Sequence, residues 1–582
     1  MLLLGAVAFA GWRAYSNAQQ RAGNANETEL VFSEVNSRGG TLTSSLRSEP
    51  RSFNRLLVPN VPTELYAILT QGKLVRVNRA TQEVEPSLAE KWSVSTDNLT
   101  YTLTLRDGVS WSDGTPLTSA DAVFSFQAVY DPKSQSILAS SLLINGAPLK
   151  VSAPDARTVV VQYPAPFGPG IRLLDNLTIV PKHKLQAALA AGKFSESWGA
   201  GTPVADLVSI GPFILTRYLP GERLVFDRNP RYWKKDTAGQ PLPYLDQIVF
   251  EIVPDQNAEL VRLQSGELDM LQQQVRPEDI ATLRPLVDQK KLQLLELGVG
   301  TDADAFFFNL RPAKWAKDPR GAWMQRKEFR QAISHAVDRE AFANTVFLGA
   351  GVPVWGPITP GNKNWFSPNV TRYPFSLERA KALLAGLGLA NRDADEWLED
   401  EKGTEARFSV IAYRGNTSVE RSAAVLREDL KPLGIAVDVS AIEQNALIDR
   451  MQRGDFDSIF FVYTPSSLDP AMSLDFWLSS GSAHIWNIEQ KTPATDWERE
   501  IDQLMLKQAA TLDEGERTRL FNEVQQIFAA NLPAMYFVAP RLYMGVSARV
   551  GDLTPAIIRP QLLWDAEHIT VRQASPAKPA SR

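Results

Sequence analysis

One stretch in the C-terminal half alternates between strand-like and helix-like patterns. Residues 408–413, 435–442 and 456–463 are short runs rich in Val, Ile, Phe and Tyr, which is typical of strands. Residues 419–430 and 446–453 between them carry apolar side chains at helical spacing. This βαβαβ order predicts a mostly parallel sheet flanked by helices. It favours an α/β fold over an all-helical or an all-strand fold.

Strand and helix patterns also occur along the rest of the chain, and no sequence repeat accompanies them. We expect strands at 40–46, 101–105, 157–162, 247–253 and 532–538, and a hairpin of 213–218 with 224–227 around Pro220-Gly221. We expect helices at 63–71, after the cap residue Thr118, between Asp255 and Gly266, and at 329–348, 497–510 and 514–530. The sequence therefore predicts a mixed α/β protein throughout.

The residues that support most enzyme chemistry are scarce. The 582 residues include no cysteine and only four scattered histidines, His183, His335, His484 and His568. Without thiols there are no disulfides, thiolate metal sites or cysteine nucleophiles. The 61 basic and 66 acidic residues give a net charge of −5, which argues against a general binder of nucleic acid. We therefore expect a binding protein with no catalytic residue, no metal and no cofactor.

The N-terminal residues have the pattern of a targeting segment. Residues 2–12 form one apolar run that is too short to span a bilayer. The run resembles the core of a secretory signal, with Ser16 and Ala18 as small residues before the expected cleavage point. A short retained membrane anchor is the alternative. We expect residues 1–38 to be a signal or anchor with a linker, and residues 572–582 to be a disordered tail. Both alternatives place the rest of the chain in the periplasm or at the extracytoplasmic face.

Five groups of short motifs follow one another along the chain. They are 84–92 (VEPSLAEKW) with 101–117 (YTLTLRDGVSWSDGTPL) and 120–124 (ADAVF); 210–213 (IGPF) with 218–222 (YLPGE) and 228–233 (RNPRYW); 242–246 (LPYLD); 265–269 (SGELD); and 329–340 (FRQAISHAVDRE) with 349–353 (GAGVP). In this order they resemble the family 5, cluster C, extracellular solute-binding proteins of ABC transporters, which include dipeptide- and oligopeptide-binding proteins. The resemblance covers about residues 39–571.

The resemblance implies an α/β fold of the two-lobed periplasmic-binding-protein type II (cluster C), with an extra domain inserted in the N-terminal lobe. Lobe I would comprise 39–80, 209–300 and 532–571, the extra domain 81–208, and lobe II 301–531. Two lobes that are joined by crossing strands can close around a solute by a hinge motion.

The resemblance also implies a function and partners. The protein would be the substrate-binding subunit of an ABC importer, would capture oligopeptides or related small polar solutes, and would deliver them to the permease in the membrane. It would act as a monomer and bind no nucleic acid. Two alternatives stay open: a secreted hydrolase with a pair of catalytic carboxylates, and a docking or chemosensory binding protein.

One position departs from the pattern of the family's peptide binders. In those proteins, the loop after the strand equivalent to 456–463 has an aspartate four residues before a proline, and it receives the ammonium group of the ligand. Here Ser466 stands four residues before Pro470. A neutral hydroxyl does not replace a carboxylate opposite a cation, although Asp469 could do so from a shifted loop. The solute class therefore stays open among peptides, opines, sugars and metal chelates.

Two loops are expected to line the pocket, because parallel sheets bind ligands at the carboxyl ends of their strands. The loop after 40–46 offers Arg51 and Asn54 to a carboxylate or carbonyl group. The loop after 456–462 offers aromatic rings for stacking and, with the following loop near His484, several polar groups. The expected ligand-binding residues are Arg51, Asn54, Tyr463, Ser466, Asp469, Trp477, Trp486 and Asn487. For Arg51 the alternative is exposure to plain solvent, and for Trp477 it is core packing.

Overall fold

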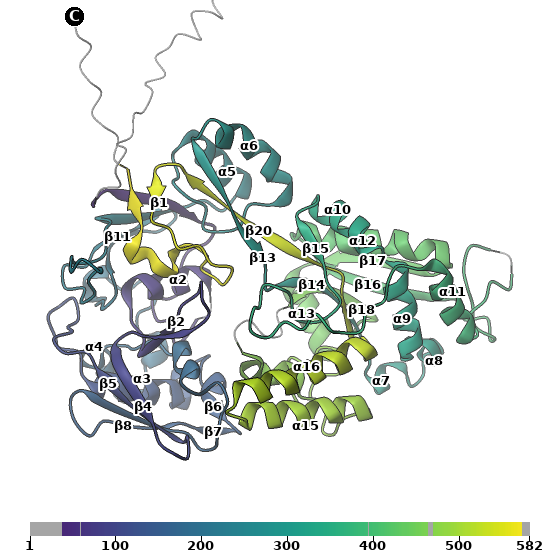
Figure 1. Cartoon of the computed structure of the whole chain (residues 1–582), viewed down its shortest axis with the longest axis horizontal. Helices are drawn as coiled ribbons and strands as arrows, with labels where there is room; N and C mark the ends of the chain where they lie inside the picture. Colours follow the sequence, from purple (N-terminus) through teal and green to yellow (C-terminus); the bar gives the residue numbers. More distant parts are fainter. Residues whose placement is uncertain (1–37, 59, 394, 464–468, 573–582) are drawn as a thin grey trace, which may run out of the picture.

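The computed structural model describes residues 38–58, 60–393, 395–463 and 469–572. Two bodies lie side by side and are joined by long crossing strands (Figure 1). We call the body on the left of Figure 1, around β1, β11 and α2, lobe I, and the body on the right, from β14 to α16, lobe II. The 81–208 segment lies below lobe I in the same view.

Lobe I is built on a sheet with the strand order β1-β12-β11-β10, in which β1 runs parallel to β12. Its strands are β1 (Thr41–Leu46), β10 (Phe213–Leu219), β11 (Arg223–Arg228), β12 (Gln247–Ile252), β13 (Leu292–Val299), β20 (Val538–Ser547), β21 (Val550–Gly551) and β22 (Thr570–Val571). Its helices are α2 (Val61–Thr70), α5 (Gln256–Ser265) and α6 (Ile280–Asp288), with the short 3-10 helices η6 (Pro277–Asp279) and η9 (Leu563–His568). A second sheet contains β13 and β20. Met270 links it to the first sheet, because it forms bridges with Ser44 of β1 and Val546 of β20.

The local signals for helix ends and for the hairpin are confirmed in lobe I. The side chain of Asp255 accepts a hydrogen bond from the N–H of Ala258 at 2.8 Å and begins α5. Gly266, with a φ of +81°, ends this helix in the left-handed conformation that glycine adopts without strain. Strands β10 and β11 pair antiparallel on either side of Gly221.

The 81–208 segment has its own antiparallel sheet with the order β4-β5-β9-β8. Its elements are β3 (Val84–Pro86), β4 (Ala89–Val94), β5 (Thr100–Leu105), β6 (Leu143–Ile144), β7 (Ala147–Pro148), β8 (Lys150–Ser152), β9 (Thr158–Gln162), α3 (Ser119–Tyr130), α4 (Lys182–Ala190), and the 3-10 helices η1 (Pro132–Ser134), η2 (Ser140–Leu142), η3 (Gly170–Asn176), η4 (Phe194–Glu196) and η5 (Val204–Asp206). Thr118, the cap residue that the sequence predicts, forms a capping box with Asp121 at the start of α3. Strand β3 pairs with β2 (Val75–Val77).

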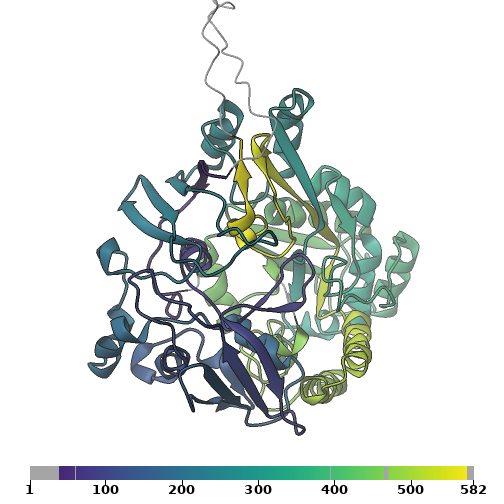
Figure 2. The same ribbon diagram turned by 60° about the vertical axis from the view of Figure 1, so that its left-hand side comes forward.

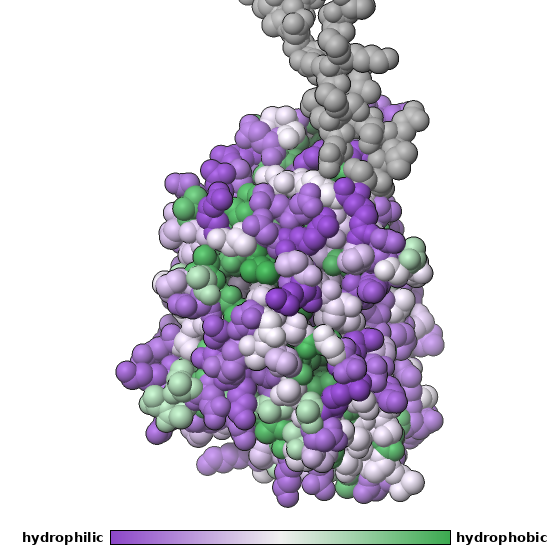
Figure 3. Space-filling view, turned by 90° about the vertical axis from the view of Figure 1, so that its left-hand side faces the viewer, coloured by the Kyte–Doolittle hydropathy of each residue, from purple (hydrophilic) through white to green (hydrophobic). Residues whose placement is uncertain are grey.

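The 81–208 segment and lobe I share one hydrophobic core. Leu103 and Phe124 of the segment belong to the same buried cluster as Phe226 and Phe250 of lobe I. A continuous core resists relative motion, so we expect the segment to move with lobe I. Figure 2 shows the two packed together after a turn of 60°, and Figure 3 shows that their outer face is mainly hydrophilic with dispersed apolar residues.

Lobe II contains the predicted βαβαβ unit in a sheet with the order β17-β16-β18-β14-β19. Its strands are β14 (Ala303–Phe308), β15 (Gly351–Pro353), β16 (Arg407–Tyr413), β17 (Ala436–Ile442), β18 (Ser458–Tyr463) and β19 (Ala534–Tyr536). Its helices are α7 (Pro312–Trp315), α8 (Gly321–Met324), α9 (Lys327–Ala336), α10 (Arg339–Phe347), α11 (Leu377–Gly386), α12 (Thr417–Leu430), α13 (Gln444–Arg453), α14 (Leu474–Trp477), α15 (Asp496–Ala510) and α16 (Glu514–Asn531), with the 3-10 helices η7 (Lys431–Leu433) and η8 (Pro470–Ser473).

The strand pairing in this sheet confirms the βαβαβ unit but corrects the prediction that the sheet is mostly parallel. Strand β16 runs parallel to β17 and β18, but β14 runs antiparallel to β18 and β19. The sheet is therefore mixed rather than mostly parallel. Strand β14 is buried on both faces, since Phe306 and Phe308 pack into one core cluster and Phe307 packs into another.

Two other predicted elements differ from the structure. The stretch 329–348 is two helices, α9 and α10, because Val337 is extended and the side chain of Asp338 caps the second helix. The stretch 532–538 holds β19, which pairs with β14 in lobe II, and only then does β20 lead back to lobe I. Residues 534–536 therefore belong to the lobe II sheet, although the resemblance assigns them to lobe I.

Candidate functional site

The carboxyl ends of the parallel strands β16 and β18 form the edge of the lobe II sheet at which a ligand is expected. Strand β16 ends at Tyr413 and β18 ends at Tyr463, and Ala303 at the start of β14 pairs with Tyr463. The ring of Tyr463 stacks on Phe476, with the centroids 5.0 Å apart and the planes inclined by 19°. This edge therefore carries two half-buried tyrosines, Tyr413 and Tyr463, and Tyr463 packs on the aromatic core of lobe II.

A buried carboxylate, that of Asp304 on β14, lies close to this edge. Asp304 is 6% exposed and accepts hydrogen bonds from the hydroxyls of Ser418 (3.4 Å) and Ser422 (3.2 Å) in α12. Burial raises the pKa of Asp304 to about 6, because the ionised form loses its hydration. Within the described residues, no Lys or Arg forms an ion pair with it. Among the described residues its carboxylate thus has hydroxyl partners but no counter-charge.

Lobe I reaches the same region through Arg559, in the loop before η9. Its guanidinium forms an ion pair with Asp302, just before β14, at 3.6 Å. A second ion pair between the lobes joins Arg421 of α12 to Glu278 of η6 at 3.5 Å. All four side chains are partly exposed, and pairs of this kind contribute little stability. The two lobes can therefore separate here at small cost.

The strands β13 and β20 pair antiparallel and connect the lobes (Figure 1). Met544 and Val546 of β20 are buried in the core of lobe I, whereas Val538 at the other end is buried in the core of lobe II. On β13, Leu297 packs against the lobe I core and Val299 packs against a lobe II cluster. Because the two ends of this pair of strands are buried in different clusters, the lobes can rotate about it.

The two predicted tryptophans lie inside lobe II. Trp477 is fully buried, and its ring packs edge-on against Phe521 (5.2 Å) and Phe528 (5.8 Å). Trp486 is also fully buried, and its indole N–H donates to Glu498 Oε1 at 3.2 Å. Core packing accounts for both rings in this structure. Both rings also pack against Phe476, on which Tyr463 stacks.

The neighbouring polar candidates are also held within lobe II. His484 places Nδ1 3.0 Å from the carbonyl oxygen of Phe476 and Nε2 3.3 Å from Glu498 Oε1. Asn487 is 8% exposed, and its main-chain N–H donates to the carbonyl of His484. These contacts order the loop between α14 and α15.

Asp469 has a partner of its own chain. It is 2% exposed, and it forms an ion pair at 2.5 Å with Arg517 of α16, which is also buried. Its carboxylate also caps η8, by accepting a hydrogen bond from the N–H of Ala471. The negative charge of Asp469 is thus already balanced. Ser466 lies outside the described residues.

The loop after β1 is attached to the 81–208 segment. Asn54 is fully buried, and its side chain donates to the hydroxyl of Ser197 at 3.1 Å and accepts from the N–H of Leu56. Arg51 is exposed. In the described part of the chain, no hydrogen bond, ion pair or ring contact joins this loop to the segment from Tyr463 to Asn487. The structure therefore gathers Tyr463, Trp477 and Trp486 around Phe476, and no described contact brings Arg51 or Asn54 to them.

A cluster in lobe I has enough ligand groups for a metal ion, namely Asp565, Glu567 and His568. Arg76 and Lys234 already form ion pairs with Glu567, at 3.1 Å and 2.6 Å, and Arg76 reaches Asp565 at 3.4 Å. The hydrogen bond that His568 Nδ1 donates to the Asp565 carboxylate raises the pKa of His568. Because two cations balance the two carboxylates, the donor set fits a salt-bridge network better than a metal site.

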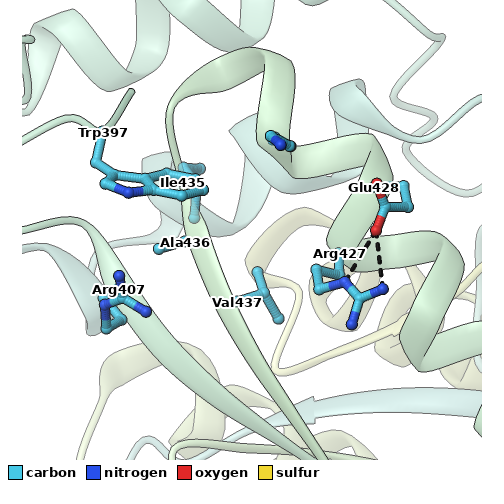
Figure 4. A pocket seen from close by; sticks show the side chains of 8 residues that line it. Trp397, Arg407, Arg427, Glu428, Ile435, Ala436 and Val437 are labelled. Atoms are coloured by element: carbon cyan, nitrogen blue, oxygen red, sulfur yellow. Dashed lines mark hydrogen bonds and ion pairs between the residues drawn. The ribbon is translucent and has the colours of Figure 1, made fainter. Parts of the chain in front are cut away.

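A shallow pocket of about 240 Å³ lies beside the edge strand β17 (Figure 4). Its lining residues are Trp397, Arg407, Arg427, Glu428, Lys431, Ile435, Ala436 and Val437. Arg427 pairs with Glu428 at 2.9 Å, and Arg407 pairs with Asp438 at 3.0 Å. The pocket lies on the side of the sheet away from β14, and these two arginines already have partners, so we do not assign the ligand site to it.

Sequence reasoning missed Asp304, Arg559 and Arg517. The signal for Asp304 is a single acidic residue inside the apolar run 303–308, where an unpaired charge is costly. The other two carry no local signal, because their partners Asp302 and Asp469 are distant in the sequence.

Comparisons with known proteins agree with this architecture. The chain is 28% identical over 533 residues to a probable ABC transporter-binding protein of Deinococcus radiodurans, a match that covers 88% of this chain and 89% of the relative. It is 26% identical over 535 residues to the dipeptide-binding protein of Escherichia coli, covering 88% and 91%. The structure of the oligopeptide-binding protein AppA from Bacillus subtilis in complex with a nonapeptide superposes with a TM-score of 0.71 at 23% identity, covering 93% of this chain and all of that chain.

These matches confirm the two-lobed periplasmic-binding-protein type II fold that the motifs imply. Within the described residues, no helix has both the length and the apolar character needed to cross a membrane. The family model of the bacterial extracellular solute-binding proteins, family 5, matches residues 83–484. The chain therefore belongs to the family 5 extracellular solute-binding proteins of bacteria.

Proposed function

We propose that this protein is the extracytoplasmic substrate-binding subunit of an ABC importer. It captures oligopeptides or related small polar solutes between its lobes and delivers them to the permease, without breaking a bond. The observation that carries this proposal is the pair of strands β13 and β20, whose ends are buried in two separate cores. Such a connection lets two rigid lobes close on a solute and open again.

The relatives support peptides as the main solute class. One relative is the dipeptide-binding protein of Escherichia coli. The oligopeptide-binding protein AppA, which has a similar fold, was solved in complex with a nonapeptide. Ser466 stands where the peptide binders of the family carry an ammonium-binding aspartate, and Asp469 is already paired with Arg517. We therefore keep related small polar solutes within the proposal. The hydrolase and docking alternatives gain no support from the comparisons.

We propose that the solute contacts Tyr463, at the edge of the lobe II sheet described above, and also Ser466, and that Arg51 and Asn54 approach the solute from the side of lobe I. Asp469, Trp477, Trp486 and Asn487 then shape the wall behind that edge. The division into lobe I (39–80, 209–300 and 532–571), an inserted domain (81–208) and lobe II (301–531) is part of this proposal, with residues 534–536 counted in lobe II. We propose a periplasmic or extracytoplasmic monomer with an N-terminal signal or anchor.

Two measurements test the proposal. Native mass spectrometry of protein purified without refolding should show a bound solute, and the mass of the released solute gives its class. Small-angle scattering with a pool of two- to five-residue peptides should show a decrease in the radius of gyration. An unchanged scattering profile at saturating peptide, together with a mass equal to that of the chain alone, would refute capture by closure.

A further inference from the structure

Lobe II also touches the 81–208 segment, below the crossing strands in Figure 1. In both Figure 1 and Figure 2, α15 and α16 lie beside this segment. The main-chain N–H of Gly168 donates to the carbonyl oxygen of Ala509, the next-to-last residue of α15, at 2.6 Å. Ala471 and Ala509 of lobe II are buried in the hydrophobic cluster that lobe I shares with the 81–208 segment. This contact therefore joins the two moving bodies at a point other than β13 and β20.

The three atoms that a Cβ at position 168 would meet most closely all belong to lobe II. A Cβ at this position would lie 2.5 Å from the carbonyl oxygen of Thr511 and 2.8 Å from Cζ of Arg517, where ordinary contacts begin at 3.4 Å. The φ angle of Gly168 is not positive, so its backbone accepts alanine without strain. When the lobes separate, the space beside Gly168 opens and this conflict disappears.

The surface that receives Gly168 is held rigidly. Arg517 is fixed by the ion pair with Asp469, by a hydrogen bond from Nε to the carbonyl of Gln508 at 3.3 Å, and by the ring of Trp365, 5.0 Å away. The last carbonyls of α15 lack partners within the helix. Arg517 satisfies that of Gln508, whereas that of Ala509 is left to Gly168. In the open protein, water can replace Gly168 as the donor.

We infer that Gly168 and the surface formed by Ala509, Thr511 and Arg517 are a closure clasp, which sets how long a captured solute stays bound. Gly168 is a positioning residue: it holds the lobes together and contacts lobe II rather than the solute. Asp469, one of the candidate site residues, fixes Arg517 through their ion pair at 2.5 Å, so the clasp is joined to the candidate site. This inference rests on the proposed capture of a solute between the lobes.

The test compares Gly168→Ala with Gly201→Ala, a matched control in the same segment. A Cβ at Gly201 meets no atom within 4 Å, and its φ is not positive either. The chain has no cysteine, so the exposed residues Lys150 and Glu500 can be replaced by cysteine and spin-labelled without other changes. Pulsed electron paramagnetic resonance then gives the distance between the 81–208 segment and α15, with and without trialanine.

We expect Gly168→Ala to lengthen this distance and to raise the dissociation rate of trialanine at least tenfold, about 1.4 kcal/mol. The association rate and the melting temperature without peptide should stay at the wild-type values, and Gly201→Ala should match the wild type throughout. Unchanged distances in Gly168→Ala would overturn the clasp, whether or not the melting temperature falls. If trialanine does not bind the wild type but the distances still lengthen, the clasp stands and the peptide part of the proposed function fails.

Discussion

Replacing Asp304 by asparagine should stabilise lobe II, and the gain should grow as the pH rises. Asparagine has nearly the same shape: its Oδ1 can accept a hydrogen bond from one of the two hydroxyls, of Ser418 and Ser422, and its amide group can donate to the other. In the folded protein, burial raises the pKa of Asp304 to about 6, whereas an unfolded aspartate titrates near a pKa of about 3.9. The folded state therefore binds more protons, and the wild type loses stability as the pH rises between these two values.

The expected size follows from the two pKa values. A difference of about 2 pH units corresponds to roughly 3 kcal/mol, and most of it develops between about pH 4 and pH 7. Asp304 is 6% exposed, so solvent screening reduces this figure little. For a unit of the size of lobe II, roughly 2–4 °C of melting temperature corresponds to each kcal/mol. Asp304→Asn should thus gain roughly 6–12 °C over the wild type by neutral pH.

The assay is calorimetric unfolding of both proteins at five values from pH 4 to pH 8, without solute. Asp302→Asn is the control, because this side chain is 40% exposed and lies two residues away. The control should differ from the wild type by a small amount that does not follow the same titration. A constant difference between Asp304→Asn and the wild type across the whole range would refute the argument that the charge of Asp304 is uncompensated.

Three further changes test the site and the connection between the lobes. Replacing Tyr463 and Ser466 together by alanine should weaken solute binding at least tenfold in calorimetric titration and leave the melting temperature without solute nearly unchanged; equal affinity would place the pocket elsewhere. Arg517→Met should cost about 3–5 kcal/mol in urea unfolding, because it leaves the Asp469 carboxylate buried without a counter-charge, and adding Asp469→Asn should recover part of the loss. No recovery would mean that the pair acts through packing. Gly361→Ala should cost about 1–3 kcal/mol in the same assay, because its Cβ would collide with main-chain oxygens at the end of the crossing strand; a neutral result would show that this approach can relax.

Elements with strong local signals could be predicted from the sequence. The βαβαβ unit was visible because its strands are short apolar runs and its helices are amphipathic, and Asp255 and Gly266 marked both ends of α5. Strand β20 was not visible beyond residue 538, because Pro540 and Arg541 interrupt its apolar pattern. Its conformation is fixed by pairing with β13 and β15, which are distant in the sequence.

The candidate site was less predictable for the same reason. The sequence around an aromatic residue such as Trp477 does not distinguish a residue that lines a cleft from one that packs in a core. The contacts of Trp477 with Phe521 and Phe528 show that it packs in a core. Nothing in the local sequence marks Asp469 as paired, since its partner Arg517 lies 48 residues away in α16. Local patterns thus predict elements and candidate loops, but the pairing of charges between elements requires the fold.

The contacts between the lobes are individually weak, and reversible capture requires this. The ion pairs Arg559–Asp302 and Arg421–Glu278 are partly exposed, so each contributes about 0–1 kcal/mol. The hydrogen bond from Gly168 to Ala509 adds about 1 kcal/mol, because water replaces it when the lobes open. These polar contacts together bias closure only modestly, so a solute that binds the closed form several kcal/mol more tightly can control the position of the lobes. A much stronger interface would keep the empty protein closed, and the binding of solute could then no longer signal its presence to the permease.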